Sequence, residues 1–337
     1  MSEADAVAVV LWIGATLYAV FGGADFGAGF WSLVAGRSEE GERPRSLIDR
    51  AIGPVWEANH VWLIFILVVL WTAFSSAFES IMSTLFIPLC LAALGIVLRG
   101  AGFAFHGTAD RVGARRIAEY LFGASSVITP FFMGTVVGAI AAGEIPVGNA
   151  AGDPVSSWLN PVSLLVGVLF VATGAYLAAV FLVSDARRYG DEDLERYFRA
   201  RALGVAIVTG AIAAVGIVVL RADARFIYDG LVGDALPLVV LSALCGIGAM
   251  ALLYRHARRG ARELAVGAVV AIIWGWGVAQ YPYLLPTDLT IAAGAATDAT
   301  LTMVLIVFVV AVILVIPSLA LLYALTQRSV LDSDHQG

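Results

Sequence analysis

The chain has 337 residues, of which 60% are hydrophobic and 14% are charged, and its formal net charge is −6. A mean hydropathy of +0.90 excludes a soluble globular protein and favours a polytopic membrane protein. All 20 basic residues are arginines, and they form no basic stretch suited to nucleic acid.

Apolar stretches long enough to cross a bilayer recur along the whole chain, since a transmembrane helix needs about 20 mainly apolar residues. We therefore predict an all-α integral membrane protein with about nine transmembrane helices. The first apolar stretch follows MSEADA, which lacks the positive region of a signal peptide, so we expect it to be kept as a helix. The expected spans are roughly 7–33, 54–76, 80–103, 117–142, 160–184, 202–221, 235–254, 262–281 and 300–325.

The arginines predict the orientation of these spans. Eighteen of the 20 arginines lie in segments on one side of the predicted bundle, and the loops on the other side hold only Arg221 and Arg225. By the positive-inside rule the N-terminus is expected outside and the C-terminus inside. We expect these arginines to set topology, with contacts to anionic lipid as the alternative. The other 18 fall near 34–52, 99–116, 185–201 and 255–262 and at Arg328.

A Gly/Pro-rich segment without arginine, residues 142–160, is the best internal boundary. It divides the chain into an N-terminal four-helix half, residues 1–150, and a C-terminal five-helix half, residues 151–337. The Gly-rich stretches 14–30 and 167–185 resemble each other weakly. Whether the two halves are pseudo-repeated helix bundles stays open.

Ionisable residues inside apolar spans are rare and usually face a bundle interior or a water path. Asp25 lies 8 residues before the inside end of its span, roughly 12 Å deep at 1.5 Å per residue. Glu57 lies one turn into the next span, and His60 follows on the same face. Arg99 ends the third span on the same side. These residues and Asn59 predict a half-channel that carries protons from the cytoplasm.

Each of these residues also has a structural interpretation. Asp25 could be an acid paired with Arg99, and Glu57 could cap its helix. His60 could be a hydrogen-bonded core residue, and Trp62 could be a packing or interfacial anchor, as could Trp56. We also expect no haem or metal site in this chain, because His60 is the sole intramembrane histidine and the methionines are scattered.

Four motifs in register resemble subunit II of the cytochrome bd quinol oxidases. They are GADFGAG (23–29), GPVWEANHVWL (53–63), LFIPLCLAALGIVLRGAGFAFH (85–106) and QYPYLLPTDLTIAAGAATDATLT (280–302). The resemblance implies a multi-pass subunit of a bacterial cytoplasmic (plasma) membrane complex that oxidises quinol and reduces O₂ to water.

The same resemblance implies that the haems b and the haem d lie in a partner, subunit I, and that this chain binds no cofactor and is inactive alone. Glu57 matches the acidic proton-path position of the family, Asp25 the helix 1 acid, Arg99 the helix 3 arginine and Trp62 the second Trp. Quinol, lipid and a small single-helix accessory subunit are the further partners to consider.

Two alternatives remain at this point. A secondary transporter would also use an intramembrane carboxylate and Gly/Pro-broken helices. A purely structural subunit would have no need of both Asp25 and Glu57.

Overall fold

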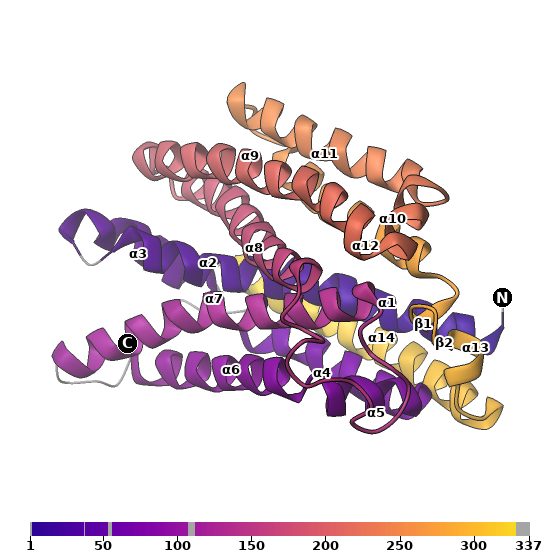
Figure 1. The fold of residues 1–337 in the computed structure, drawn as a ribbon. Coiled ribbons are helices and arrows are strands. Elements are labelled where there is room, and N and C mark those ends of the chain that lie inside the picture. The colour runs from indigo at the N-terminus through magenta and orange to yellow at the C-terminus, as the bar shows by residue number, and fades with distance from the viewer. Residues whose placement is uncertain (1, 37, 53–55, 107–111, 328–337) are drawn as a thin grey trace.

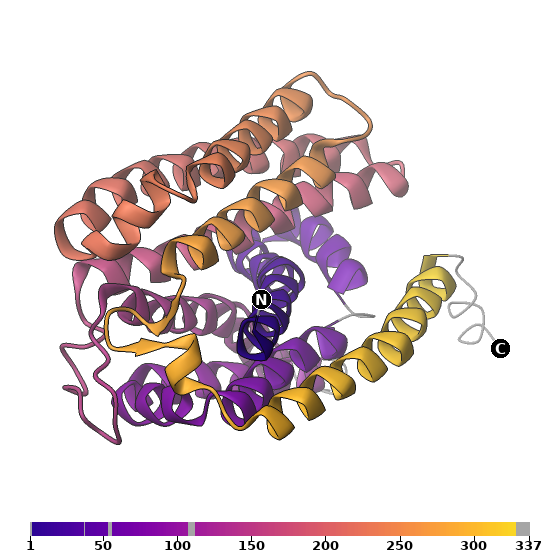
Figure 2. The ribbon, with the colours of Figure 1, turned by 90° about the vertical axis from the view of Figure 1, so that its right-hand side faces the viewer.

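Long helices lying side by side make up nearly the whole molecule (Figure 1). The computed structural model describes residues 2–36, 38–52, 56–106 and 112–327. It leaves out the side chains of residues 52, 56–59, 103–106, 112–116, 118, 316, 319–320 and 322–327. Viewed nearly along the helices, the N-terminal helix lies at the centre of the bundle (Figure 2).

The first span is one continuous helical rod with a change of pitch in its middle. It begins at a capping box, in which Ser2 and Asp5 satisfy each other's backbone N–H groups. It then runs through α1 (Glu3–Leu17), a π-helical segment (Tyr18–Gly22) and α2 (Gly23–Ala35). Asp25 therefore lies one turn beyond a π-helical segment, a feature often found near functional sites.

A short helix follows on the arginine-rich side. This helix, α3 (Glu39–Ile52), is amphipathic and buries Leu47 and Ile48 against α8. The predicted loop over 34–52 is thus largely helical, because its buried positions 41, 44, 47 and 48 recur at helical spacing and form one face.

The second span bends sharply at its C-terminal end. Helix α4 (Trp56–Ala73) stops at Phe74, and α5 (Ser75–Thr84) leaves at an angle of 118°. Phe74, Ala77 and Ile81 are buried, which explains why the chain between the expected spans 54–76 and 80–103 is helical. Helix α6 (Phe86–His106) then returns toward the arginine-rich side.

The centre of the bundle is packed through small residues. Helix α7 (Val112–Ala142) and α8 (Pro161–Arg188) flank the non-helical segment 143–160, and α8 packs against both α2 and α7. A Cβ at Gly27 would overlap the backbone of Gly174, and a Cβ at Gly134 would lie 2.7 Å from the Cα of Gly167. Only glycine lets these backbones approach so closely. The division at residue 150 into two halves stays a prediction.

The C-terminal part forms a second layer of helices and a small outer hairpin. It includes α9 (Glu192–Asp223), α10 (Arg225–Val232), α11 (Leu236–Tyr254) and α12 (Ala261–Gln280). The short antiparallel pair β1 (Tyr283–Leu285) and β2 (Leu289–Thr290) follows, then α13 (Ile291–Gly294) and α14 (Asp298–Gln327).

Among the described residues, seven helices are long and apolar enough to cross a membrane, or eight if the bent α4–α5 pair counts as one span. The described apolar part of α6, Phe86–Gly102, is shorter. The all-α, multi-pass architecture is therefore confirmed, whereas the count of nine spans is not.

Candidate functional site

A buried ion pair joins the first and third predicted spans. Arg99 on α6 donates from Nη2 to Asp25 Oδ1 at 2.7 Å and to the backbone carbonyl of Asp25 at 3.0 Å. The side chains are 1% and 3% exposed. The predicted pairing of these two residues is therefore present, in a place where water cannot compete for either charge.

Helix α7 completes the surroundings of the Arg99 guanidinium. The Nη1 of Arg99 donates to the Ser126 hydroxyl on α7. That hydroxyl in turn donates to the Phe122 carbonyl at 2.6 Å. The guanidinium lies 4.3 Å from the centre of the Phe122 ring and 5.0 Å from that of Phe26. The aromatic faces attract the cation and keep water away from it.

Two atoms of this cluster retain hydrogen-bonding capacity. Asp25 Oδ2 and Arg99 Nε are buried and have no hydrogen-bond partner within the described part of the chain, and the same holds for the hydroxyl of Thr129. Thr129 lies one turn from Ser126 along α7 and faces Gly95 on α6. A buried polar atom without a partner is costly. The carboxylate of Asp25 thus has one oxygen held by Arg99 and one available for a proton or a water molecule.

The second predicted span reaches this cluster through His60. The His60 ring on α4 meets the Phe26 ring edge-on, with 6.3 Å between the ring centroids, and Phe26 directly follows Asp25. The backbone of Glu57 and Asn59 lies in the first turn of α4, but their side chains lie outside the described residues. Their predicted roles at the cluster stay predictions.

Trp62 lies in a different environment from the other predicted residues. Its ring contacts Phe65 edge-on at 6.4 Å between centroids, and Phe65 contacts Phe308 on α14. The ring contact of Trp62 therefore lies within α4, and Phe65 makes the contact with α14, so the role of Trp62 stays a prediction.

Sequence reasoning missed the contribution of α7. Ser126 and Phe122 belong to the expected span 117–142, whose one acid, Glu119, lies close to its start, so the ionisable residues gave no reason to place Ser126 beside Arg99. The signal was the run ASSVIT (124–129), in which hydroxyl groups recur inside an apolar stretch. Such residues commonly bond across helices in membranes.

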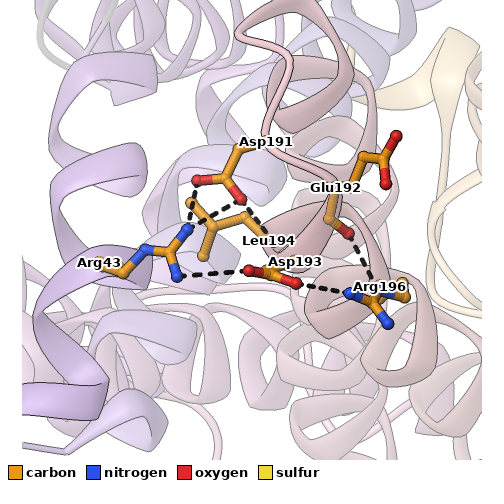
Figure 3. A network of polar contacts seen from close by, with 6 residues as sticks. All are labelled: Arg43, Asp191, Glu192, Asp193, Leu194 and Arg196. Atoms are coloured by element: carbon orange, nitrogen blue, oxygen red, sulfur yellow. Dashed lines mark hydrogen bonds and ion pairs between the residues drawn. The ribbon is translucent and has the colours of Figure 1, made fainter.

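A second polar network lies on the arginine-rich side, outside the bundle core (Figure 3). Arg43 on α3 contacts Asp191 at 2.9 Å and Asp193 at 3.6 Å, at the turn between α8 and α9. Asp191 also caps α9 by accepting from the Leu194 N–H at 3.0 Å. That hydrogen bond, together with the Arg43 guanidinium, holds the pKa of the Asp191 carboxyl below its usual range. The network fastens α3 to the second half of the chain.

No group of three or more His, Cys, Asp or Glu side chains that could hold a metal ion occurs in the described ranges. His256, the other histidine with a described side chain, contacts Arg199 through Nδ1 at 2.6 Å. Cys90 and Cys245 are both free thiols.

Comparisons with known proteins agree on one family. Residues 4–326 match the family model described as cytochrome bd terminal oxidase subunit II. The chain is 26% identical to cytochrome bd ubiquinol oxidase subunit 2 of Bacillus subtilis, over 83% of this chain and 82% of that protein. It is also 26% identical to cytochrome bd-I ubiquinol oxidase subunit 2 of Escherichia coli, over 57% of this chain and 50% of that protein.

The fold agrees with the sequence comparison. A chain of the bd oxidase structure from Geobacillus thermodenitrificans is 27% identical and superposes with a TM-score of 0.80. The match covers 96% of this chain and 98% of that chain.

Proposed function

Because the chain belongs to the cytochrome bd terminal oxidase subunit II family, and is therefore a membrane-spanning subunit of a terminal oxidase complex, we propose that its Asp25–Arg99 cluster helps to deliver cytoplasmic protons to the site of oxygen reduction. The observation that carries this proposal is the free Oδ2 of a buried, ion-paired Asp25. The two relatives described above are named as ubiquinol oxidase subunits, and another relative, from Bacillus subtilis, is named as a putative menaquinol oxidase subunit. In this proposal the complex oxidises two quinols and reduces one O₂ to two waters.

The chemistry of that reaction requires a proton path. Reducing O₂ to water takes up four protons, and bare protons do not cross hydrocarbon. A carboxylate in the inner half of the bundle can accept a proton and pass it on through hydrogen bonds or trapped water. Arg99 keeps Asp25 fixed through one oxygen, so the other oxygen can exchange the proton without movement of the side chain.

Glu57 is the natural first carboxylate of this path. It lies three residues before His60, hence on the same face of α4, and the His60 ring contacts Phe26 beside Asp25. Glu57 at the start of α4 would take protons from cytoplasmic water, and Asn59 would orient the carboxylate or a water. This direction of flow follows from an N-out, C-in orientation, which the arginine distribution supports.

The remaining chemistry belongs to the complex rather than to this chain. The haems b and the haem d would lie in subunit I, which this chain would support as a scaffold, and the isolated chain would be inactive. The shortage of paired histidines favours this division.

The substitution Glu57→Gln tests the proposal, because it keeps shape and hydrogen bonding but removes titration. Oxygen consumption by the purified complex should fall by at least about tenfold, equivalent to roughly 1.4 kcal/mol on the limiting step. The reduced-minus-oxidised haem spectrum should stay unchanged, and Glu57→Asp should retain more activity. Wild-type oxygen consumption in a normally assembled Glu57→Gln complex would place the proton path in the partner.

A further inference from the structure

A second site lies at the arginine-rich end of the second helix layer and involves none of the residues of the Asp25 cluster. A cavity of about 200 Å³ opens between α8, α11 and α12, beside the turn that joins the last two helices. Part of its wall is apolar, formed by Val180, Val183 and Leu253. Four arginines line the rest: Arg187, Arg258, Arg259 and Arg262.

The charge of this cavity is not balanced by nearby acids. Glu263 is the one acid in its lining, and Glu195 pairs with Arg187 at 3.0 Å. Asp185 lies within electrostatic reach of Arg262. Arg258 and Arg259 are exposed and form no hydrogen bond or ion pair with any described residue. Two guanidinium groups therefore remain available to a ligand.

Contacts within the chain hold the walls of this cavity in place without a ligand. Arg187 Nη1 donates to the Ala257 carbonyl at 2.6 Å, which ties the turn to the end of α8. The Arg262 guanidinium lies 4.1 Å from the centre of the Phe181 ring on α8. Gly260, with a φ of +95°, closes the turn and begins α12 without a side-chain cap, so the first N–H groups of that helix add positive potential.

We propose that this cavity binds a phosphate group. The planar fork of arginine matches phosphate oxygens in two parallel hydrogen bonds, and a cavity set between helices on the arginine-rich side excludes part of the competing water. The phosphate can belong to the headgroup of an anionic phospholipid or to free phosphate in the cytoplasm. The first source fits the apolar part of the wall, and α11 also exposes Ile247 and Tyr254.

A binding experiment on the delipidated oxidase complex distinguishes the two sources. The probes are phosphatidylglycerol, phosphatidylcholine and inorganic phosphate, with affinity measured by native mass spectrometry or by titration of the melting temperature. The double variant Arg258→Gln/Arg259→Gln should weaken phosphatidylglycerol binding by about tenfold or more, or roughly 1.4 kcal/mol. The matched control Arg255→Gln is exposed on the same turn but does not line the cavity, and it should bind like the wild type.

Each outcome decides the question. Binding of phosphatidylglycerol alone, lost in the double variant, assigns the site to an anionic lipid. Binding of inorganic phosphate with the same dependence on the two arginines assigns it to free phosphate. Equal binding of every probe to the wild type and the double variant, or no binding to either, overturns the proposal. If the double variant does not assemble, Arg259→Gln against Arg255→Gln gives the same comparison.

Discussion

Two aspartate–arginine pairs of nearly equal length lie in opposite surroundings in this molecule. The Asp25–Arg99 pair spans 2.7 Å, and its side chains are 3% and 1% exposed. The Asp191–Arg43 pair spans 2.9 Å, but its side chains are 26% and 60% exposed. The distance between the charged atoms alone therefore says little about how much each pair contributes to stability.

The difference lies in the solvent. Water screens the exposed pair, and the flexible Arg43 side chain loses entropy when it is held, so such pairs contribute little to stability. The buried pair has lost its water, and each charge depends on its partner and on the few groups around it. The exposed network holds α3 to the α8–α9 turn, whereas the buried pair and its Ser126 partner link α2, α6 and α7 inside the bundle.

The largest effect should come from breaking the buried pair. Arg99→Met keeps the length of the side chain but leaves the Asp25 charge without compensation, which should destabilise the protein by about 3–5 kcal/mol. Thermal unfolding of the purified complex measures this. The double variant Asp25→Leu/Arg99→Met removes both charges and should recover part of the loss. A double variant as unstable as the single one would contradict the account.

The packing around the pair should give the next largest effect. A Cβ at Gly29 would lie 2.6 Å from Ser126 Cβ and 2.8 Å from Arg99 Nη1. Gly29→Ala should therefore displace the guanidinium and cost about 1–3 kcal/mol. Gly100→Ala is the matched control, because a Cβ there meets nothing within 4 Å although the residue adjoins Arg99. Equal melting temperatures for the two variants would show that the buried pair tolerates movement.

Replacing the Asp25 carboxyl by an amide should lower the rate as well as the stability, because it removes the titratable group and also leaves the buried Arg99 charge without a counter-charge. Asp25→Asn keeps a carbonyl oxygen for Arg99, and oxygen consumption should fall by at least about tenfold, roughly 1.4 kcal/mol. Glu79→Gln, an exposed residue on α5, is the control for loss of a carboxylate and should keep full activity. An Asp25→Asn complex with normal turnover would leave Asp25 a purely structural role.

The exposed pair should give the smallest effect, and that effect should depend on pH. The pKa of Asp191 is lowered, first by the Leu194 N–H and then by Arg43. A lowered carboxyl pKa contributes stability above its unfolded value, and that stability is lost as the pH falls through the folded value.

The difference in melting temperature between the wild type and Asp191→Asn should therefore be constant near neutral pH. It should shrink below about pH 4, near the ordinary pKa of aspartate. Arg43→Gln should remove the part of this pH dependence that Arg43 causes. A difference that grows in acid would mean that the charged carboxylate is not what stabilises this turn.

Much of the architecture could be predicted from composition alone. Runs of apolar residues located most of the spans, because a hydrocarbon environment admits almost nothing but helices. The exceptions include α9, which begins ten residues before the expected start at 202, and α6, which begins six residues after the expected start at 80. The sequence also determined that Asp25, Arg99 and His60 belong to one half of the bundle, since their depth follows from their distance to the ends of their spans. Four motifs in register were enough to indicate the family.

Only the tertiary structure decided which groups meet. The sequence offered Asp25 with Arg99 as one alternative. The third partner, Ser126, comes from α7, where the charged residues Arg115, Arg116 and Glu119 all lie about two turns or more before it. The bend at Phe74 and the helix α3 were also not predicted from the sequence, since each depends on a few apolar side chains that pack against residues far away in the chain. Hydropathy can be read from the sequence because it depends on neighbouring residues in the chain. The pairing of buried polar groups depends instead on the distance between helices, which glycines such as Gly27 and Gly174 make short.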